Sequence, residues 1–215
     1  MANALTVTAE QTEFTPVQKQ ALQALGMGAA QPGELLVFLR TCQKTGLDPF
    51  RKQIYLVTQR DETSPTGYKS TIQVDLNGLL TIARRTVMET GEAFSIAPIL
   101  WCGTDGEWYD VWPDPQWYPT GAKACVKRGE ETFTEVALFR EFAPFKDGRL
   151  TGLWDKMPSH MIGKVALAHA LRSAFPVELS GFYTDDEMAQ EGPAVGVIGE
   201  WAEAPQVSVG EEALD

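Results

Sequence analysis

The stretch from Trp154 to Phe175 constrains the fold of this chain more than any other segment. It predicts one helix that opens near Pro158, because the first turn of a helix tolerates a residue without an N–H group. Small residues recur in it at steps of three and four, at Gly163, Ala166, Ala170 and Ala174. This spacing places them on one helix face, which can therefore pack very closely against a neighbouring element.

The same predicted helix carries four cationic or titratable side chains, which are Lys156, His160, Lys164 and Arg172. A mostly buried helix rarely keeps such groups without an anionic partner. We therefore expect their partner to be either a carboxylate of the protein itself or a molecule that binds to it.

The net charge of −11 is concentrated in the C-terminal part of the chain. Residues 34–176 contain 17 Lys and Arg and 17 acidic residues, whereas residues 177–215 contain ten acidic residues and no Lys or Arg. Between residues 119 and 175 there are nine basic and six acidic residues. This distribution permits a basic surface on an acidic protein.

Hydrophobic periodicity predicts an α+β core in which helices pack on a mostly antiparallel sheet, formed by a hairpin and a meander. Helices are expected at about 16–25, 34–45 and 76–87, and the hairpin at 53–59 and 68–74. The meander strands are expected at 93–101, 107–112, 122–127 and 132–142, with Arg140 on the last of them. We expect a groove between this sheet and the long helix.

The expected organisation has three parts. Residues 1–33 form a partly helical N-terminal segment, and residues 34–188 form the core domain. Residues 189–215 form an acidic tail without hydrophobic periodicity or counter-ions, which predicts disorder.

The sequence contains no recognisable catalytic machinery. It has no GxxxxGK[ST] phosphate loop, and its two histidines, His160 and His169, are nine residues apart rather than four. Asp185, Asp186 and Glu187 could hold Mg²⁺ as in a nuclease, but adjacent acids after a turn more often cap a short helix. We therefore expect no catalytic residue, no metal ion and no cofactor.

Cysteine usage and the N-terminus indicate the compartment. Cys42, Cys102 and Cys125 form no CxxC pair, which indicates reduced, buried thiols. The first residues lack the basic start and apolar block of a secretion signal, and no apolar run reaches membrane-spanning length. We therefore expect a cytoplasmic protein without membrane contact.

Cationic residues alternate with aromatic ones in the second half of the core. The aromatic residues are Phe139, Phe142, Phe145 and Trp154, and the cations are Lys123, Lys127, Arg128, Arg140, Lys146, Arg149, Lys156, Lys164 and Arg172. Lys and Arg neutralise phosphates, and flat rings support unstacked bases. The set indicates nucleic-acid binding, with a solvated face over core aromatics as the alternative.

Four sequence blocks strengthen the first interpretation: GLDPFRKQIY at 46–55, VDLNGL at 74–79, the long block at 139–176, and YTDDEM at 183–188. In this order they resemble the blocks of the phage RecT and lambda Beta family of single-strand annealing proteins. The resemblance covers residues 35–188. It implies a Rad52-like annealing core with a positively charged groove and no covalent chemistry.

The resemblance also implies a function and partners. Such a protein binds single-stranded DNA without ATP and anneals complementary strands in phage homologous recombination, as a ring or helical filament of identical subunits. Its ligands are single-stranded DNA and the annealed duplex, in the cytoplasm of the bacterial host. A phage 5′–3′ exonuclease and the host single-strand binding protein are candidate partners. The residues after Met188 are too few for the separate C-terminal domain of lambda Beta.

Matched motif by motif, the resemblance assigns DNA contacts to Lys52, Lys69, Arg140, Lys146, Lys156, Lys164 and Arg172. The complete predicted DNA-binding set adds Lys123, Lys127, Arg128, Arg149 and His160. Two other functions remain open from the residues alone. One is a metal-dependent nuclease that uses Asp185, Asp186 and His160, and the other is a protein-interaction module that acts through the acidic tail.

Overall fold

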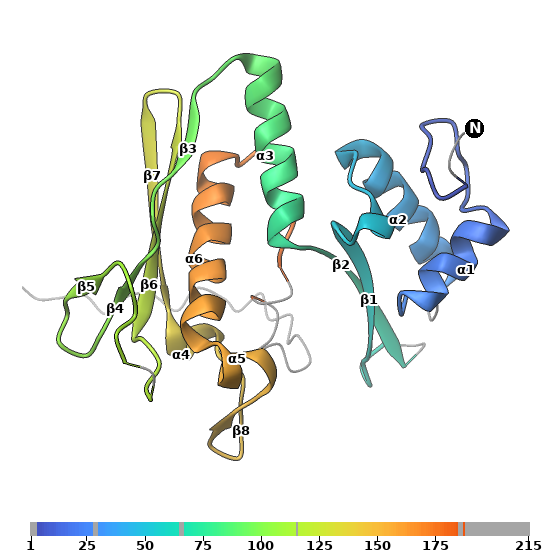
Figure 1. The fold of residues 1–215 in the computed structure, drawn as a ribbon. Coiled ribbons are helices and arrows are strands. Elements are labelled where there is room, and N and C mark those ends of the chain that lie inside the picture. Colours follow the sequence, from blue (N-terminus) through green and yellow to red (C-terminus); the bar gives the residue numbers. More distant parts are fainter. Residues whose placement is uncertain (1–3, 28–29, 65–66, 115, 185–186, 188–215) are drawn as a thin grey trace, which may run out of the picture.

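The computed structural model describes residues 4–27, 30–64, 67–114, 116–184 and 187, so the predicted tail at 189–215 lies outside the described residues. The described chain forms two units. Figure 1 shows the N-terminal one on the right, where helices lie beside a hairpin, and the C-terminal one on the left, where long helices lie beside a sheet.

The N-terminal unit contains α1 (Pro16–Ala24), α2 (Pro32–Thr45), the short 3₁₀ helix η1 (Pro49–Arg51), β1 (Ile54–Arg60) and β2 (Tyr68–Val74). Thr15 and Gln18 form a capping box at the start of α1. Gly46 ends α2 with a φ of 63°, a left-handed conformation that favours glycine. The predicted antiparallel hairpin is confirmed, with Ile54 opposite Val74.

The residues before α2 pack onto it. The rings of Phe14 and Phe38 lie 6.0 Å apart, and the Gln43 side chain donates to the carbonyl oxygen of Thr8 at 2.7 Å. Since α2 begins at Pro32, the expected boundary at residue 33 falls in its first turn.

The C-terminal unit starts with α3 (Leu76–Thr90), whose N-cap is Asp75 and whose C-cap is Gly91. Its five-stranded antiparallel sheet contains β3 (Phe94–Ile96), β4 (Leu100–Cys102), β5 (Trp108–Tyr109), β6 (Gly121–Arg128) and β7 (Glu131–Leu138). β6 is central, because it pairs with β3 and β4 along one edge and with β7 along the other. The remaining elements are α4 (Phe139–Phe142), β8 (Phe145–Lys146), β9 (Arg149–Leu150), α5 (Gly152–Lys156) and α6 (Pro158–Ala174).

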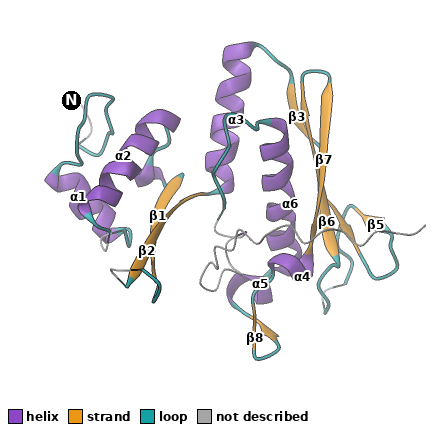
Figure 2. Ribbon diagram, turned by 180° about the vertical axis from the view of Figure 1, so that it is seen from behind, coloured by secondary structure: helices purple, strands orange, loops and turns teal. Residues whose placement is uncertain are grey.

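The small-residue face of α6 packs directly on the sheet, and α3 lies beside α6 (Figures 1 and 2). Ala166 and Ala170 are fully buried, and a Cβ added to Gly163 would lie 3.5 Å from Ile99. This close packing confirms the predicted face of the helix. The interior of this contact is filled, and a hollow lies at its margin between β7 and α6, lined by Glu135, His169, Arg172 and Ser173. The expected groove between the sheet and the long helix stays a prediction.

The strand predicted at 107–112 covers only Trp108–Tyr109, and three other predicted boundaries are wrong for local reasons. The long helix is divided at Met157, which has φ −141° and ψ 56°, because a residue before proline disfavours helical backbone. The strand predicted at 93–101 is divided around Pro98, which cannot donate to a sheet. The last strand ends at Leu138 rather than at 142. The three-residue spacing of Phe139 and Phe142 fits the helical turn α4, so Arg140 lies on a helix.

Hydrogen bonds outside the covalent connection hold the units together, among them the following two. The Arg85 guanidinium on α3 donates to the carbonyl oxygen of Thr45 at 2.7 Å. The backbone N–H of Val74 at the end of β2 donates to the carbonyl oxygen of Tyr183 at 3.1 Å. The α+β class with antiparallel sheets packed against helices is thus confirmed. Among the residues that the structure describes, every helix is too short or too polar to span a bilayer.

Candidate nucleic-acid interface

α4, the β8–β9 hairpin and α5 lie side by side at one end of the C-terminal unit (Figures 1 and 2), and these elements carry four cations. All four residues are exposed. We call this group the basic end, and its members are Arg140, Lys146, Arg149 and Lys156.

The β8–β9 hairpin places two of these charges directly opposite each other. Lys146 pairs with Arg149 in the strand register, and the turn between them is Asp147-Gly148, with both φ angles positive. Like charges in this arrangement repel and destabilise a hairpin. Among the described residues, Lys146, Arg149 and Lys156 have no ion-pair partner. A bound anion would relieve the repulsion.

Aromatic rings from α4, β8, α5 and the loop before β6 pack together beneath the basic end. Tyr118 stacks on Phe139 with ring centroids 4.3 Å apart and an angle of 8° between the planes. Phe139 meets Trp154 edge to face at 5.5 Å, and Tyr118 meets Phe145 edge to face at 6.3 Å. Since Phe139 and Trp154 are buried, α4 and α5 are fixed relative to each other, and so are the backbones that carry the cations.

The N-terminus of α6 lies next to the basic end, because α6 follows α5 after one residue. Its N-cap residue, Met157, has no side-chain hydrogen bond to the free N–H groups of the first turn. The positive pole of the helix dipole therefore adds to the field of the basic end. His160 is exposed in this first turn, whereas Lys164, one turn later, is half-buried and has a contact within the protein.

Lys123 and Lys127 lie on the face of the sheet opposite α6. They alternate along β6 with the buried Ala122, Ala124 and Val126. The Lys123 ammonium lies 4.2 Å from the centroid of the Trp108 ring, and Lys127 is exposed. These two lysines therefore form a separate cationic site on the outer sheet face.

Arg128 has partners within the protein. Its guanidinium donates to Glu92 at 3.0 Å, to Glu178 at 3.3 Å and to the carbonyl oxygen of Ala174 at 3.0 Å. It also lies over the ring of Phe175. Its charge is therefore balanced by its own chain.

Arg172 has a more deeply buried partner. Both of its terminal nitrogens donate to the Glu187 carboxylate, one of them at 2.8 Å, and His169 contacts the same carboxylate at 2.9 Å. The Glu187 side chain is only 4% exposed. Burial would raise the pKa of this carboxyl, but the hydrogen bonds from His169 and Arg172 outweigh burial and hold the pKa at about 2.

The last two predicted residues lie on the N-terminal unit. Lys52 is exposed directly after η1 with a φ of 60°, and Lys69 is exposed on β2, opposite Gln59. In both ribbon views the free end of the β1–β2 hairpin and the β8–β9 hairpin project toward the same side of the molecule (Figures 1 and 2). The twelve predicted residues thus do not line one trough. Four form the basic end, with His160 beside it, and the others lie in separate places.

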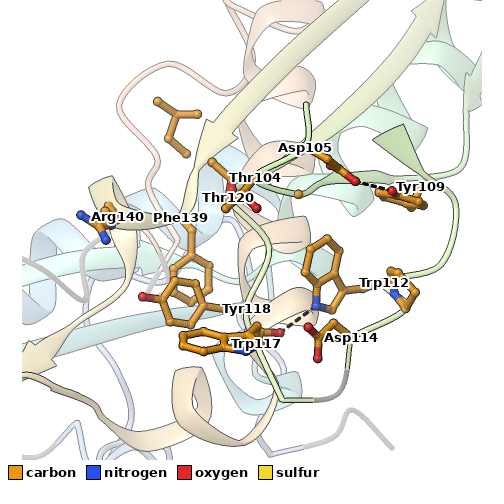
Figure 3. A pocket seen from close by; sticks show the side chains of 13 residues that line it. Thr104, Asp105, Tyr109, Trp112, Asp114, Trp117, Tyr118, Thr120, Phe139 and Arg140 are labelled. Carbon is orange, nitrogen blue, oxygen red and sulfur yellow. Dashed lines mark hydrogen bonds between the residues drawn. The ribbon is translucent and has the colours of Figure 1, made fainter. Parts of the chain in front are cut away.

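Sequence reasoning missed an aromatic pocket next to the basic end (Figure 3). The loop between β5 and β6 supplies Trp112, Trp117 and Tyr118, and α4 supplies Phe139 and Arg140. Three aromatic residues within seven positions were the available signal.

One thiol and the acidic residues of the described part of the chain bear on the question of catalysis. Burial raises the pKa of the Cys42 thiol to about 12, so this thiol is not a nucleophile at neutral pH. No three His, Cys, Asp or Glu side chains in the described part of the chain are placed to share a metal ion. Asp185 and Asp186 lie outside that part.

The fold and the basic end define an α+β protein with a candidate nucleic-acid surface. The model of the RecT family matches residues 8–197, which is most of the chain, and the chain therefore belongs to the RecT family. This family comprises single-strand annealing proteins of phage recombination. No curated protein and no solved structure matches the chain.

Proposed function

We propose that this protein binds single-stranded DNA without ATP and anneals it to its complement during phage homologous recombination. Membership of the RecT family gives the class of function. The observation that carries the proposal to the residue level is the cross-strand pair Lys146 and Arg149, two exposed like charges for which DNA phosphates are matching anions.

The strand contacts the protein through its phosphates, and its bases stay available for a second strand. Lys146, Arg149 and Lys156 provide the main contact, and Arg140 and His160 flank it. Lys69 and Lys52 extend it onto the N-terminal unit, while Lys123 and Lys127 can contact DNA along the outer sheet face. Arg128 and Arg172 are left out, because each forms an ion pair with a carboxylate of the protein, and Lys164 is left out, because it is half-buried. Sequence specificity then comes from base pairing.

A few cations per subunit give weak binding, so identical subunits combine their contacts along one strand in a ring or filament. A phage 5′–3′ exonuclease that makes the single strands, and the host single-strand binding protein, are the expected partners in the bacterial cytoplasm. The domain that does this work is the expected core, residues 34–188, together with the start of α2 at Pro32, and the acidic tail is not required for annealing.

The test is annealing of labelled complementary oligonucleotides without nucleotide, over a series of salt concentrations. We expect annealing without ATP and an affinity for single strands that falls linearly with salt on a double logarithmic plot. The variant K146A/R149A should lower that slope by about 1.4, since each lost phosphate contact on a single strand contributes about 0.7. An affinity that does not change with salt would refute the proposal.

The matched control is K44A/R84A, which also removes one lysine and one arginine, both exposed and away from the basic end. It should keep the wild-type slope, and an equal loss in both variants would contradict the assignment of the contact. Two added measurements address the alternatives. Cleavage of the oligonucleotides with Mg²⁺ would indicate a nuclease, and loss of annealing on deletion of residues 190–215 would indicate that the tail is the working part.

A further inference from the structure

A pocket of about 750 Å³ lies where β6 begins and β7 ends, beside the basic end. Figure 3 shows the rings of Trp112, Trp117 and Tyr118 together in its lower part, and Asp105 with Tyr109 in its upper part. Arg140 stands at its margin next to Phe139. The pocket thus combines aromatic surface with carboxylates, and a cation of the basic end borders it.

Hydrogen bonds within the loop hold the pocket in shape. The Trp112 indole N–H donates to the carbonyl oxygen of Trp117 at 2.8 Å, and the backbone N–H of Gln116 donates to Asp114 at 2.8 Å. Tyr118 is fixed by its stacking on the buried Phe139. A pocket formed before binding loses little conformational entropy when a ligand enters.

The exposed ring in this pocket is that of Trp117, which is 66% exposed. Indole offers a broad π-face, on which any nucleobase can stack. The Asp105 and Asp114 carboxylates, which also line the pocket, are hydrogen-bond acceptors. They match the amino and imino donors of a base and repel a phosphate, which is why the phosphates of a bound strand would stay outside, at the basic end.

We infer that the pocket takes one unpaired nucleobase of a single strand whose phosphates contact the basic end. The inference rests on the proposed function and adds a specific ligand group to it. A base in the pocket cannot pair at the same time, so it must leave when a complementary strand anneals. The pocket therefore favours single-stranded DNA over duplex.

The test compares W117A with W117F and with V111A. Phenylalanine keeps an aromatic face, and Val111 is 70% exposed on the same loop without lining the pocket. Affinities are measured for a normal oligonucleotide, for one with abasic sites that keeps every phosphate, and for a duplex. Thermal unfolding of each variant checks the fold.

We expect W117A to bind the normal single strand about tenfold more weakly, the effect of one lost stacking contact, with an unchanged salt slope and unchanged duplex affinity. W117F should retain most of the affinity, and V111A all of it. The wild type should lose affinity for the abasic strand, whereas W117A should lose nothing more, because the two changes remove the same contact.

Wild-type affinity in W117A would overturn the inference and leave the proposed function intact. An equal loss of affinity for single strand and duplex in W117A would also overturn it. A change of oligomer size in W117A without a change in DNA affinity would overturn it as well, because it indicates that a protein segment occupies the pocket. Failure of the wild type to bind single strands would instead refute the proposed function itself.

Discussion

The arginines at the end of β6 and on α6 differ from the cations of the basic end in what surrounds them. Arg128 and Arg172 each contact carboxylates of the chain, and the Glu187 partner of Arg172 is buried. Lys146 and Arg149 instead lie opposite each other on the two strands of a hairpin that has a two-residue turn. The difference separates cations that stabilise the fold from cations that are available to a ligand. The sequence alone does not distinguish the two kinds, because it does not show which cations have a carboxylate partner.

The largest expected effect is a loss of stability on removal of Arg172, a cation that stabilises the fold. R172A leaves the buried Glu187 with one fewer partner, and breaking a buried ion pair costs about 3–5 kcal/mol. We expect a loss of this order in the free energy of unfolding, measured with urea. The salt slope of DNA binding, measured at a temperature where the variant is folded, should stay at the wild-type value. A reduced slope would move Arg172 into the DNA contact.

The next effect is a pH dependence of stability. The pKa of Glu187 is about 2 in the folded protein and about 4.5 in its ordinary range, so the folded state favours the ionised form. Its contribution is therefore fully present above about pH 4.5 and is lost as the pH falls toward 2. It amounts to about 3 kcal/mol. Urea unfolding over this window should show a steeper acid loss in wild type than in E187Q. Parallel curves would mean that His169 and Arg172 do not lower the pKa of Glu187 in the folded protein.

A charge reversal in the hairpin should separate stability from binding. K146E replaces a repulsive cross-strand pair with an attractive one, which stabilises the hairpin by roughly 0.2–1 kcal/mol. The same change removes one phosphate contact and adds a repulsive charge, so affinity for single-stranded DNA should fall by about tenfold. Thermal unfolding and binding titrations check the two signs. A fall in both quantities would show that Lys146 has a structural role.

The smallest effect concerns Glu92, an exposed partner of Arg128. Its carboxylate is 38% exposed, and exposed pairs contribute little because water and salt screen them. We expect E92Q to leave the midpoint of thermal unfolding and DNA binding nearly unchanged. A large fall in the midpoint would show that Arg128 depends on Glu92 more than on Glu178 and the Ala174 carbonyl.

The sequence was sufficient for most of the fold because its signals are local. Asp75 caps α3, and Gly46 and Gly91 end helices, through interactions within a few residues. The site was predicted only in part, because its electrostatics depend on residues distant in sequence. Arg128, for example, contacts Glu92, which is 36 positions away, and Glu178, which is 50 positions away.

The aromatic pocket was missed for a related reason. The sequence shows Trp112, Trp117 and Tyr118 close together, but only the stacking of Tyr118 on Phe139 shows which way the loop folds. Arg140 was placed on a strand because alternation was followed past Leu138, where the chain turns into α4.

The bond from Val74 to Tyr183 has a practical consequence for shortened versions of this protein. The last described residues close the hairpin unit onto the C-terminal unit, and Glu187 neutralises Arg172 a few positions later. A truncation intended to remove only the acidic extension should therefore start after Met188. A truncation that starts at residue 180 would also remove the contacts of Tyr183 and Glu187 with the rest of the fold. A loss of activity in such a variant would then reflect a damaged fold rather than the absence of the extension.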